Sequence, residues 1–110
     1  MSYTYEQIAE MSFKILTFAN AAKSDAIQSI YAAKKGNFSE AEKRIASAHK
    51  NIIESEKHHT ELLQREAKGE ELKIPLLFIH AEDQMLTCQT LVLLAEEFVE
   101  LYKRISNKNN

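Results

Sequence analysis

The sequence contains few of the residues that break or cross-link a chain, with one proline, two glycines and one cysteine in 110 residues. A sheet of many short strands needs more turn-forming residues than this, so we expect an all-α fold. The lone cysteine, Cys88, excludes an internal disulfide. Because 45% of the residues are hydrophobic, we expect one globular domain over residues 1–110 rather than a disordered tail.

The chain also lacks an excess of positive charge and a long apolar run. Its 14 lysines and arginines are outnumbered by 16 acidic residues, which argues against a nucleic-acid partner. The longest apolar runs, at residues 76–79 and 91–95, are far shorter than the ~20 residues of a membrane span. The first residues show no basic segment followed by an apolar one. We therefore expect a cytoplasmic protein without membrane insertion.

Caps and turn residues divide the chain into three expected helices of about thirty residues, each about 45 Å long. Capping boxes predict two helix starts, glycines at C′ positions predict two helix ends, and a proline suits the first turn of the last helix. In chain order these residues are Thr4 with Gln7, Gly36, Ser39 with Glu42, Gly69 and Pro75. The expected fold is an antiparallel three-helix bundle.

Apolar residues at alternating steps of three and four predict the seam along which each helix packs. The expected seams are Ile8, Met11, Ile15, Phe18 and Ala22; then Ala41, Ile45, Ala48, Ile52, Ser55, His59 and Leu62; then Leu77, His80, Gln84, Thr87, Leu91, Leu94, Phe98 and Leu101. The third helix carries a second apolar column, formed by Leu76, Ile79, Leu86 and Leu93. Two partner helices cannot cover both columns, so we expect the chain to form an oligomer.

Polar residues interrupt the third helix in the segment FIHAEDQMLT, at residues 78–87. Asp83 falls within the second apolar column, where a lone buried carboxylate is costly. It is either paired or hydrated, or it meets its symmetry mates on an oligomer axis and shares a cation with them. His80 lies on the other column with Gln84 and Thr87, either as a core histidine with satisfied nitrogens or as a reactive imidazole.

Four stretches in this order resemble a known family: FANAAKS at residues 18–24, AKKGNF at 33–38, REAKGEE at 65–71 and HAEDQMLT at 80–87. Over nearly its whole length the chain is similar to the enzyme IIA proteins of the lactose/cellobiose class of the bacterial phosphoenolpyruvate-dependent sugar phosphotransferase system (PTS). The last stretch is the most specific, because the family pattern there is His-Ala/Gly-Gln-Asp-His-Leu-Met-Thr.

The resemblance implies a phosphocarrier, which is a component of a phosphotransferase. Its implied acceptor is His80, with Gln84 and Thr87 as possible contacts to the phosphoryl group. Its implied assembly is a homotrimer with nine helices, in which Asp83 binds one divalent cation, expected to be Mg²⁺, on the three-fold axis. Its implied partners are phospho-HPr as donor and the cognate enzyme IIB as acceptor, with the membrane enzyme IIC downstream. The implied sugar is a β-linked disaccharide of the lactose, cellobiose or chitobiose class.

Several positions depart from the family pattern. Gln84 replaces a second histidine, so the site loses a group that can become cationic. Glu82 replaces a glutamine, and we expect it to be a solvated surface residue. In the first two helices, Ala21 replaces an aspartate, Lys23 an arginine, Glu56 a histidine and His59 a glutamine.

Two rival functions remain open at this point. Glu56-x-x-His59 and His80-x-x-Asp83 have metal-ligand spacing on a helix face, which would suit a metal-binding helical bundle. A regulatory helical adaptor without phosphotransfer is the other rival. The remaining histidine on the second helix, His49, is expected to be structural.

Overall fold

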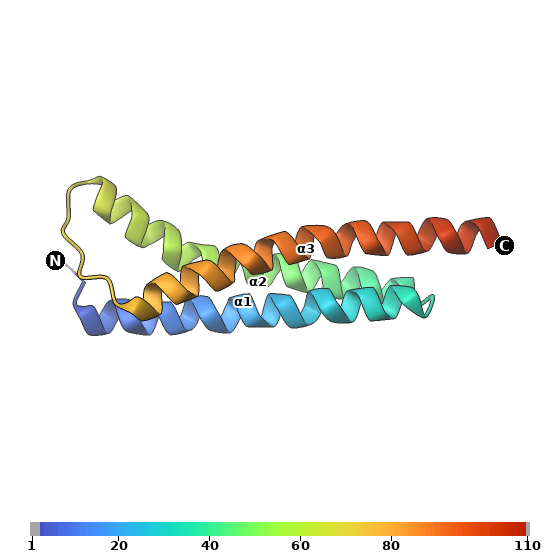
Figure 1. The fold of residues 1–110 in the computed structure, drawn as a ribbon, viewed down its shortest axis with the longest axis horizontal. Helices are drawn as coiled ribbons and strands as arrows, with labels where there is room; N and C mark the ends of the chain where they lie inside the picture. The colour runs from blue at the N-terminus through green and yellow to red at the C-terminus, as the bar shows by residue number, and fades with distance from the viewer. Residues whose placement is uncertain (1–2, 110) are drawn as a thin grey trace.

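The structure of the protein is a computed structural model that describes residues 3–109. Three long helices make up the fold: α1 (Tyr5–Lys34), α2 (Phe38–Ala67) and α3 (Leu76–Asn109). They form a rod of 61 × 20 × 18 Å in which α2 runs antiparallel to α1 and α3 (Figure 1). Residues 3–109 contain no strand. The all-α class, the three helices and the slender shape were therefore predicted correctly.

The start of α1 is fixed by the expected capping box. The hydroxyl of Thr4 accepts from the backbone N–H of Gln7 at 3.1 Å, and the Gln7 side chain accepts from the Thr4 N–H at 2.8 Å. Two N–H groups that the helix cannot satisfy internally are thus paired.

The start of α2 differs from the expectation. Its N-cap is Asn37, whose side chain accepts from the N–H of Glu40 at 3.4 Å, so the capping box predicted at Ser39 is wrong. Gly36, with φ +82°, ends α1 directly before this cap. The turn is therefore too short to leave Ser39 outside the helix. At the other end of α2, Gly69 has φ +94° and occupies the C′ position, as predicted.

The core runs along α1, which packs against both other helices, whereas α2 and α3 contact each other less. The seams predicted for α1 and α2 are largely confirmed, except that Ala19 is buried in place of Phe18 and His59 is only half-buried. The seam predicted for α3 is wrong. The buried residues of that helix are Ala81, Met85, Cys88, Val92, Ala95 and Val99.

A second apolar face on α3 is confirmed, and in this chain it is uncovered. We call it the apolar stripe: Leu76, Ile79, Leu86, Leu93, Leu94, Phe98, Leu101 and Ile105, each between 45% and 79% exposed. Large exposed apolar surfaces commonly mark interaction sites. None of the helices over residues 3–109 has an apolar stretch sufficient to cross a bilayer.

Candidate functional site

His80 lies in the second turn of α3, with its imidazole exposed to solvent. The adjoining Ala81 is fully buried against the other helices, so the backbone beneath the ring is held by the core. Within residues 3–109 the ring makes no hydrogen bond. Of the two alternatives for His80, the core histidine with satisfied nitrogens is therefore wrong within the single chain. The imidazole is accessible to other molecules.

Gln84 and Thr87 lie one and two turns beyond His80 on the same side of α3. The Thr87 hydroxyl donates to the backbone carbonyl of Asp83 at 2.9 Å, so its only proton is already engaged. The carboxamide of Gln84 is half-buried and has no hydrogen-bond partner in the described part of the chain. Gln84 is therefore the free donor beside the imidazole.

On α1, Lys23 is exposed to solvent. Burial raises the pKa of the Cys88 thiol, and the positive charge of Lys23 offsets that effect in part. Cys88 lies one turn beyond Gln84 on α3.

Asp83 is exposed and lies among residues of the apolar stripe, with Ile79 one turn before it and Leu86 one turn after it. This confirms its place in the second apolar column. Residues 3–109 contain no group of three His, Cys, Asp or Glu side chains that could hold a metal ion. A cation on Asp83 would thus require carboxylates from further copies of the chain.

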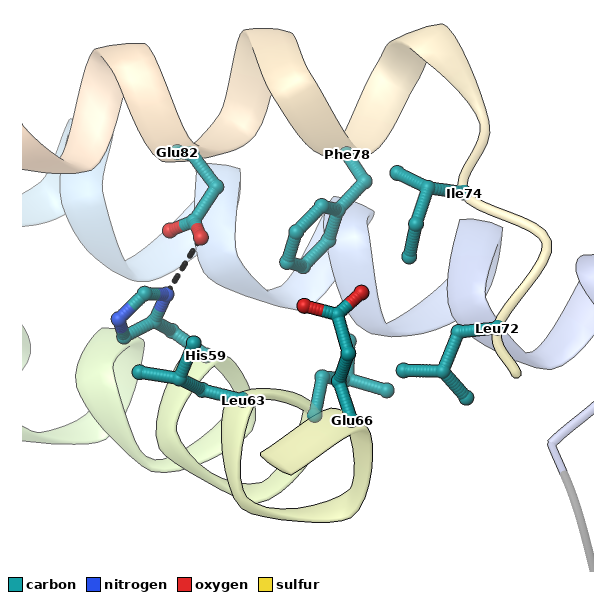
Figure 2. A pocket seen from close by; sticks show the side chains of 8 residues that line it. His59, Leu63, Glu66, Leu72, Ile74, Phe78 and Glu82 are labelled. Atoms are coloured by element: carbon teal, nitrogen blue, oxygen red, sulfur yellow. Dashed lines mark hydrogen bonds and ion pairs between the residues drawn. The ribbon is translucent and has the colours of Figure 1, made fainter. Parts of the chain in front are cut away.

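Glu82 does not lie on the solvated surface as expected. Its side chain is 22% exposed and turns toward α2, where Glu82 Oε1 lies 2.5 Å from His59 Nδ1 (Figure 2). The other oxygen, Glu82 Oε2, is buried and has no partner among the described residues. Two of the positions that depart from the family pattern are therefore in direct contact.

His59 and Glu82 belong to a row of polar pairs that joins α2 to α3, which we call the polar ladder. Its pairs are Glu42 with Lys103, His49 with Glu96, Glu56 with Gln89, and His59 with Glu82. The α3 members recur every seven residues, a spacing that keeps them on one side of the helix. That seven-residue repeat is visible in the sequence, and it is the signal from which this contact could have been predicted.

The polar ladder also separates the residues of the rival metal site. Gln89 Nε2 donates to Glu56 Oε1 at 2.6 Å, whereas His59 bonds Glu82, so Glu56 and His59 have different partners. His49 pairs with Glu96 and joins two helices, as a structural residue would.

The comparisons with known proteins agree with this geometry. The family model described as "PTS system, Lactose/Cellobiose specific IIA subunit" matches residues 10–103. The lichenan-specific phosphotransferase enzyme IIA component of Bacillus subtilis is 33% identical over 103 residues, covering 94% of each chain. The lactose-specific EIIA component of Streptococcus mutans is 31% identical over 99 residues, covering 90% of this chain and 95% of that protein.

A solved structure shows the same architecture. The crystal structure of the cellobiose-specific enzyme IIA from Bacillus anthracis superposes with a TM-score of 0.87 at 37% identity, covering 98% of this chain and 96% of the other. Similarity of sequence and of fold thus extends over almost the whole chain. The protein belongs to the lactose/cellobiose-specific IIA family of the sugar phosphotransferase system, whose members take part in phosphotransfer during sugar uptake.

Proposed function

We propose that His80 accepts a phosphoryl group from phospho-HPr and passes it to a cognate enzyme IIB. The observation that carries this proposal is the exposed imidazole of His80 beside the unpaired carboxamide of Gln84 on a helix held by the core. The stretch that contains both residues is the most specific part of the resemblance to the family, although Gln84 itself departs from the family pattern. Exposure on an open surface suits a site that two proteins must reach in turn.

Phosphoryl transfer requires few groups of the chain besides an accessible imidazole and a nearby hydrogen-bond donor. A neutral imidazole nitrogen attacks phosphorus directly, so no general base is needed, and the nitrogen–phosphorus bond that forms replaces the bond to the donor's histidine. Transfer onward reverses the exchange. The protein's part is to position the ring and to offer N–H donors to the phosphoryl oxygens, which Gln84 can do.

The sugar is assigned by class alone. Relatives carry names specific for lichenan, lactose and cellobiose, and we propose a β-linked disaccharide of the lactose, cellobiose or chitobiose class. A carrier of this kind contacts proteins and not sugar, so sugar recognition belongs to the membrane enzyme IIC. Function beside that enzyme and HPr places the chain in the cytoplasm.

The assembly that we propose is a homotrimer joined through the apolar stripe. Covering the exposed leucines of α3 with further copies of α3 removes them from water. The same arrangement brings three Asp83 carboxylates together, and carboxylate oxygens suit a hard divalent cation such as Mg²⁺. Asp83 is exposed and its carboxylate has no partner among residues 3–109, whereas each ladder carboxylate is paired, so the Asp83 oxygens are available to such an ion.

Intact-mass spectrometry tests the phosphocarrier function. The wild-type protein is incubated with phosphoenolpyruvate, enzyme I and HPr at neutral or alkaline pH, where phosphohistidine survives. We expect one added phosphoryl group on the wild type and none on His80→Ala. The matched control is His58→Ala, a histidine of α2 that should still allow phosphorylation. Phosphorylation of His80→Ala, or none of the wild type with an active relay, would overturn the proposal.

A further inference from the structure

The outward side of α1 carries no carboxylate along most of its length, although the whole chain has 16 acidic residues. From Met11 to Lys34 the only acidic residue is Asp25, which is 8% exposed and is held by Arg44 of α2. Two lysines of this stretch, Lys23 and Lys34, are exposed, and neither pairs with a carboxylate of residues 3–109. This side of a chain with net charge −2 is therefore locally positive.

Helix geometry places the two lysines in one row that faces away from α2. Asp25 marks the side of α1 that meets α2, and Lys23 and Lys34 lie about 160° and about 180° around the helix from it. Steps of three or four residues connect the members of this row, which we call the cationic row: Asn20, Lys23, Ile27, Tyr31 and Lys34. An open groove of about 500 Å³ is lined by Asn20, Lys23, Ser24, Ile27, Gln28 and Tyr31.

The cationic row and His80 lie on the same face of the rod, where α1 and α3 run side by side (Figure 1). Glu82 marks the side of α3 that meets α2, and His80 lies about 160° around the helix from it. Burial raises the pKa of Cys88 on α3 and the charge of Lys23 opposes this effect, so the two residues are near each other. Cys88 is only about 12 Å along α3 from His80. A protein partner commonly covers about 800 Å² of each surface, enough to include His80 and Lys23 together.

The charge of the cationic row favours one of the two proteins that exchange the phosphoryl group. A surface of one sign attracts the opposite sign and raises the rate of association. The donor arrives with the phosphoryl group, which carries close to two negative charges at neutral pH, whereas the acceptor arrives without it. After transfer the phosphoryl group is on this chain, where its charge offsets that of the lysines. The attraction is therefore strongest for the phosphorylated donor.

We propose that the cationic row is the docking surface for the phosphorylated donor protein, which Lys23 and Lys34 attract before its phosphoryl group reaches His80. This inference rests on the phosphocarrier function proposed above and names the surface that the donor uses. The two lysines act on association and leave the chemical step to His80, so they are docking residues and not catalytic ones.

Quenched-flow sampling with intact-mass detection, at low and at saturating phospho-HPr, tests this surface. The double variant Lys23→Glu with Lys34→Glu should accept the phosphoryl group about tenfold more slowly below saturation, whereas its rate at saturation should stay within about twofold of the wild type. The matched control is Lys14→Glu, which reverses the same charge on the α2 side of α1, about 20° from Asp25, and should behave as the wild type does. Circular dichroism checks that all variants keep their helix content.

Salt gives a second measurement, which needs no variant. Raising sodium chloride from about 50 to about 500 mM should slow transfer from phospho-HPr to the wild type several-fold, and the double variant should lose or reverse this dependence. Onward transfer to enzyme IIB should change less than about twofold in the double variant. Unchanged transfer from phospho-HPr, an equal loss in Lys14→Glu or an equal loss in the enzyme IIB step would overturn the inference. A wild type that takes no phosphoryl group from an active relay would overturn the phosphocarrier function itself.

Discussion

His59 on α2 and Glu82 on α3 form one contact, with Nδ1 2.5 Å from Oε1, and both positions depart from the family pattern. Glutamine stands at both positions in that pattern, so one polar pair has been exchanged for another. The two side chains are 25% and 22% exposed, which leaves the contact only partly hydrated. The effect of substituting either residue on stability should therefore depend on which residue occupies the other position.

We expect that dependence to appear in a double-mutant cycle. His59→Ala leaves Glu82 without a partner and should lower the free energy of unfolding by about 1–3 kcal/mol. The double variant His59→Gln with Glu82→Gln restores a hydrogen-bonded pair and should lie within about 1 kcal/mol of the wild type. Urea unfolding followed by circular dichroism at 222 nm measures both. Purely additive effects of the two single glutamine substitutions would show that the contact contributes nothing.

A second buried polar group, Asp25, ties α1 to α2. Asp25 is 8% exposed. Its carboxylate accepts hydrogen bonds from Arg44 at 3.2 Å, Ser47 at 2.5 Å and Asn51 at 3.1 Å. The hydrogen bonds that Arg44 donates to Asp25 and Glu40 raise the pKa of the Arg44 guanidinium. Asp25→Ala removes the shared acceptor and should destabilise the fold by about 2–4 kcal/mol.

Thermal and urea unfolding of Asp25→Ala measure this loss. Glu97→Ala is the matched control, since it removes an exposed carboxylate and should change the free energy of unfolding by less than about 0.5 kcal/mol. Asp25→Asn keeps two of the hydrogen-bonding roles and should fall between the two. A loss for Asp25→Ala no larger than that of the control would show that the three donors find equivalent partners elsewhere.

How far the sequence predicted the fold depended on whether a helix had one apolar face or several. α2 has one, and its seam from Ala41 to Leu62 was predicted correctly except at His59, which is half-buried. α3 is apolar on several sides, so its periodicity does not identify the buried side. The prediction favoured the larger leucines, but the core takes Ala81, Cys88 and Ala95, whose small side chains allow α3 to approach α1 closely.

For the candidate site too, part of the geometry could be predicted from the sequence and part could not. The positions of His80, Gln84 and Thr87 along one side of α3 follow from helix geometry and were predicted. The contact of Glu82 with His59 was missed because a glutamate on a helix is ordinarily exposed. Its partner lies on another helix, and only the packing of α2 against α3 brings the two together. The engagement of the Thr87 hydroxyl by the Asp83 carbonyl also depends on a rotamer that sequence does not specify.

The apolar stripe predicts how the oligomer responds to charge. Leu93 is 63% exposed on α3, so Leu93→Lys should leave the helix content unchanged and convert the proposed trimer to a monomer. Ile53→Lys is the control, because Ile53 is 55% exposed on α2, outside the stripe. Sedimentation velocity measures the assembly state. A wild type that sediments as a monomer would contradict both the stripe interface and the shared cation at Asp83.

The burial of Cys88 predicts slow labelling of its thiol and a pH dependence of the stability of the fold. It is 1% exposed, and burial raises its pKa, so the folded protein should react with Ellman's reagent at pH 8 far more slowly than the urea-unfolded chain. Since the folded pKa is raised, the thiol stabilises the fold fully below its unfolded pKa, and that contribution is lost as pH rises through the folded value. The stability difference between wild type and Cys88→Ala should therefore shrink in alkaline solution. Equal labelling rates for folded and unfolded chains would contradict the burial.

The last prediction separates the two side chains that accompany His80. The Gln84 carboxamide is unpaired, whereas the proton of Thr87 is committed to the Asp83 carbonyl. Gln84→Ala should therefore slow phosphoryl transfer from phospho-HPr by about tenfold, equivalent to about 1.4 kcal/mol, while Thr87→Val should slow it less than about threefold. Quenched-flow sampling with intact-mass detection measures both rates. Gln84→His supplies a group that can become cationic and should equal or exceed the wild-type rate. If Thr87→Val is the slower of the two variants, the hydroxyl leaves the backbone when the phosphoryl group arrives, and Thr87 rather than Gln84 is the principal donor.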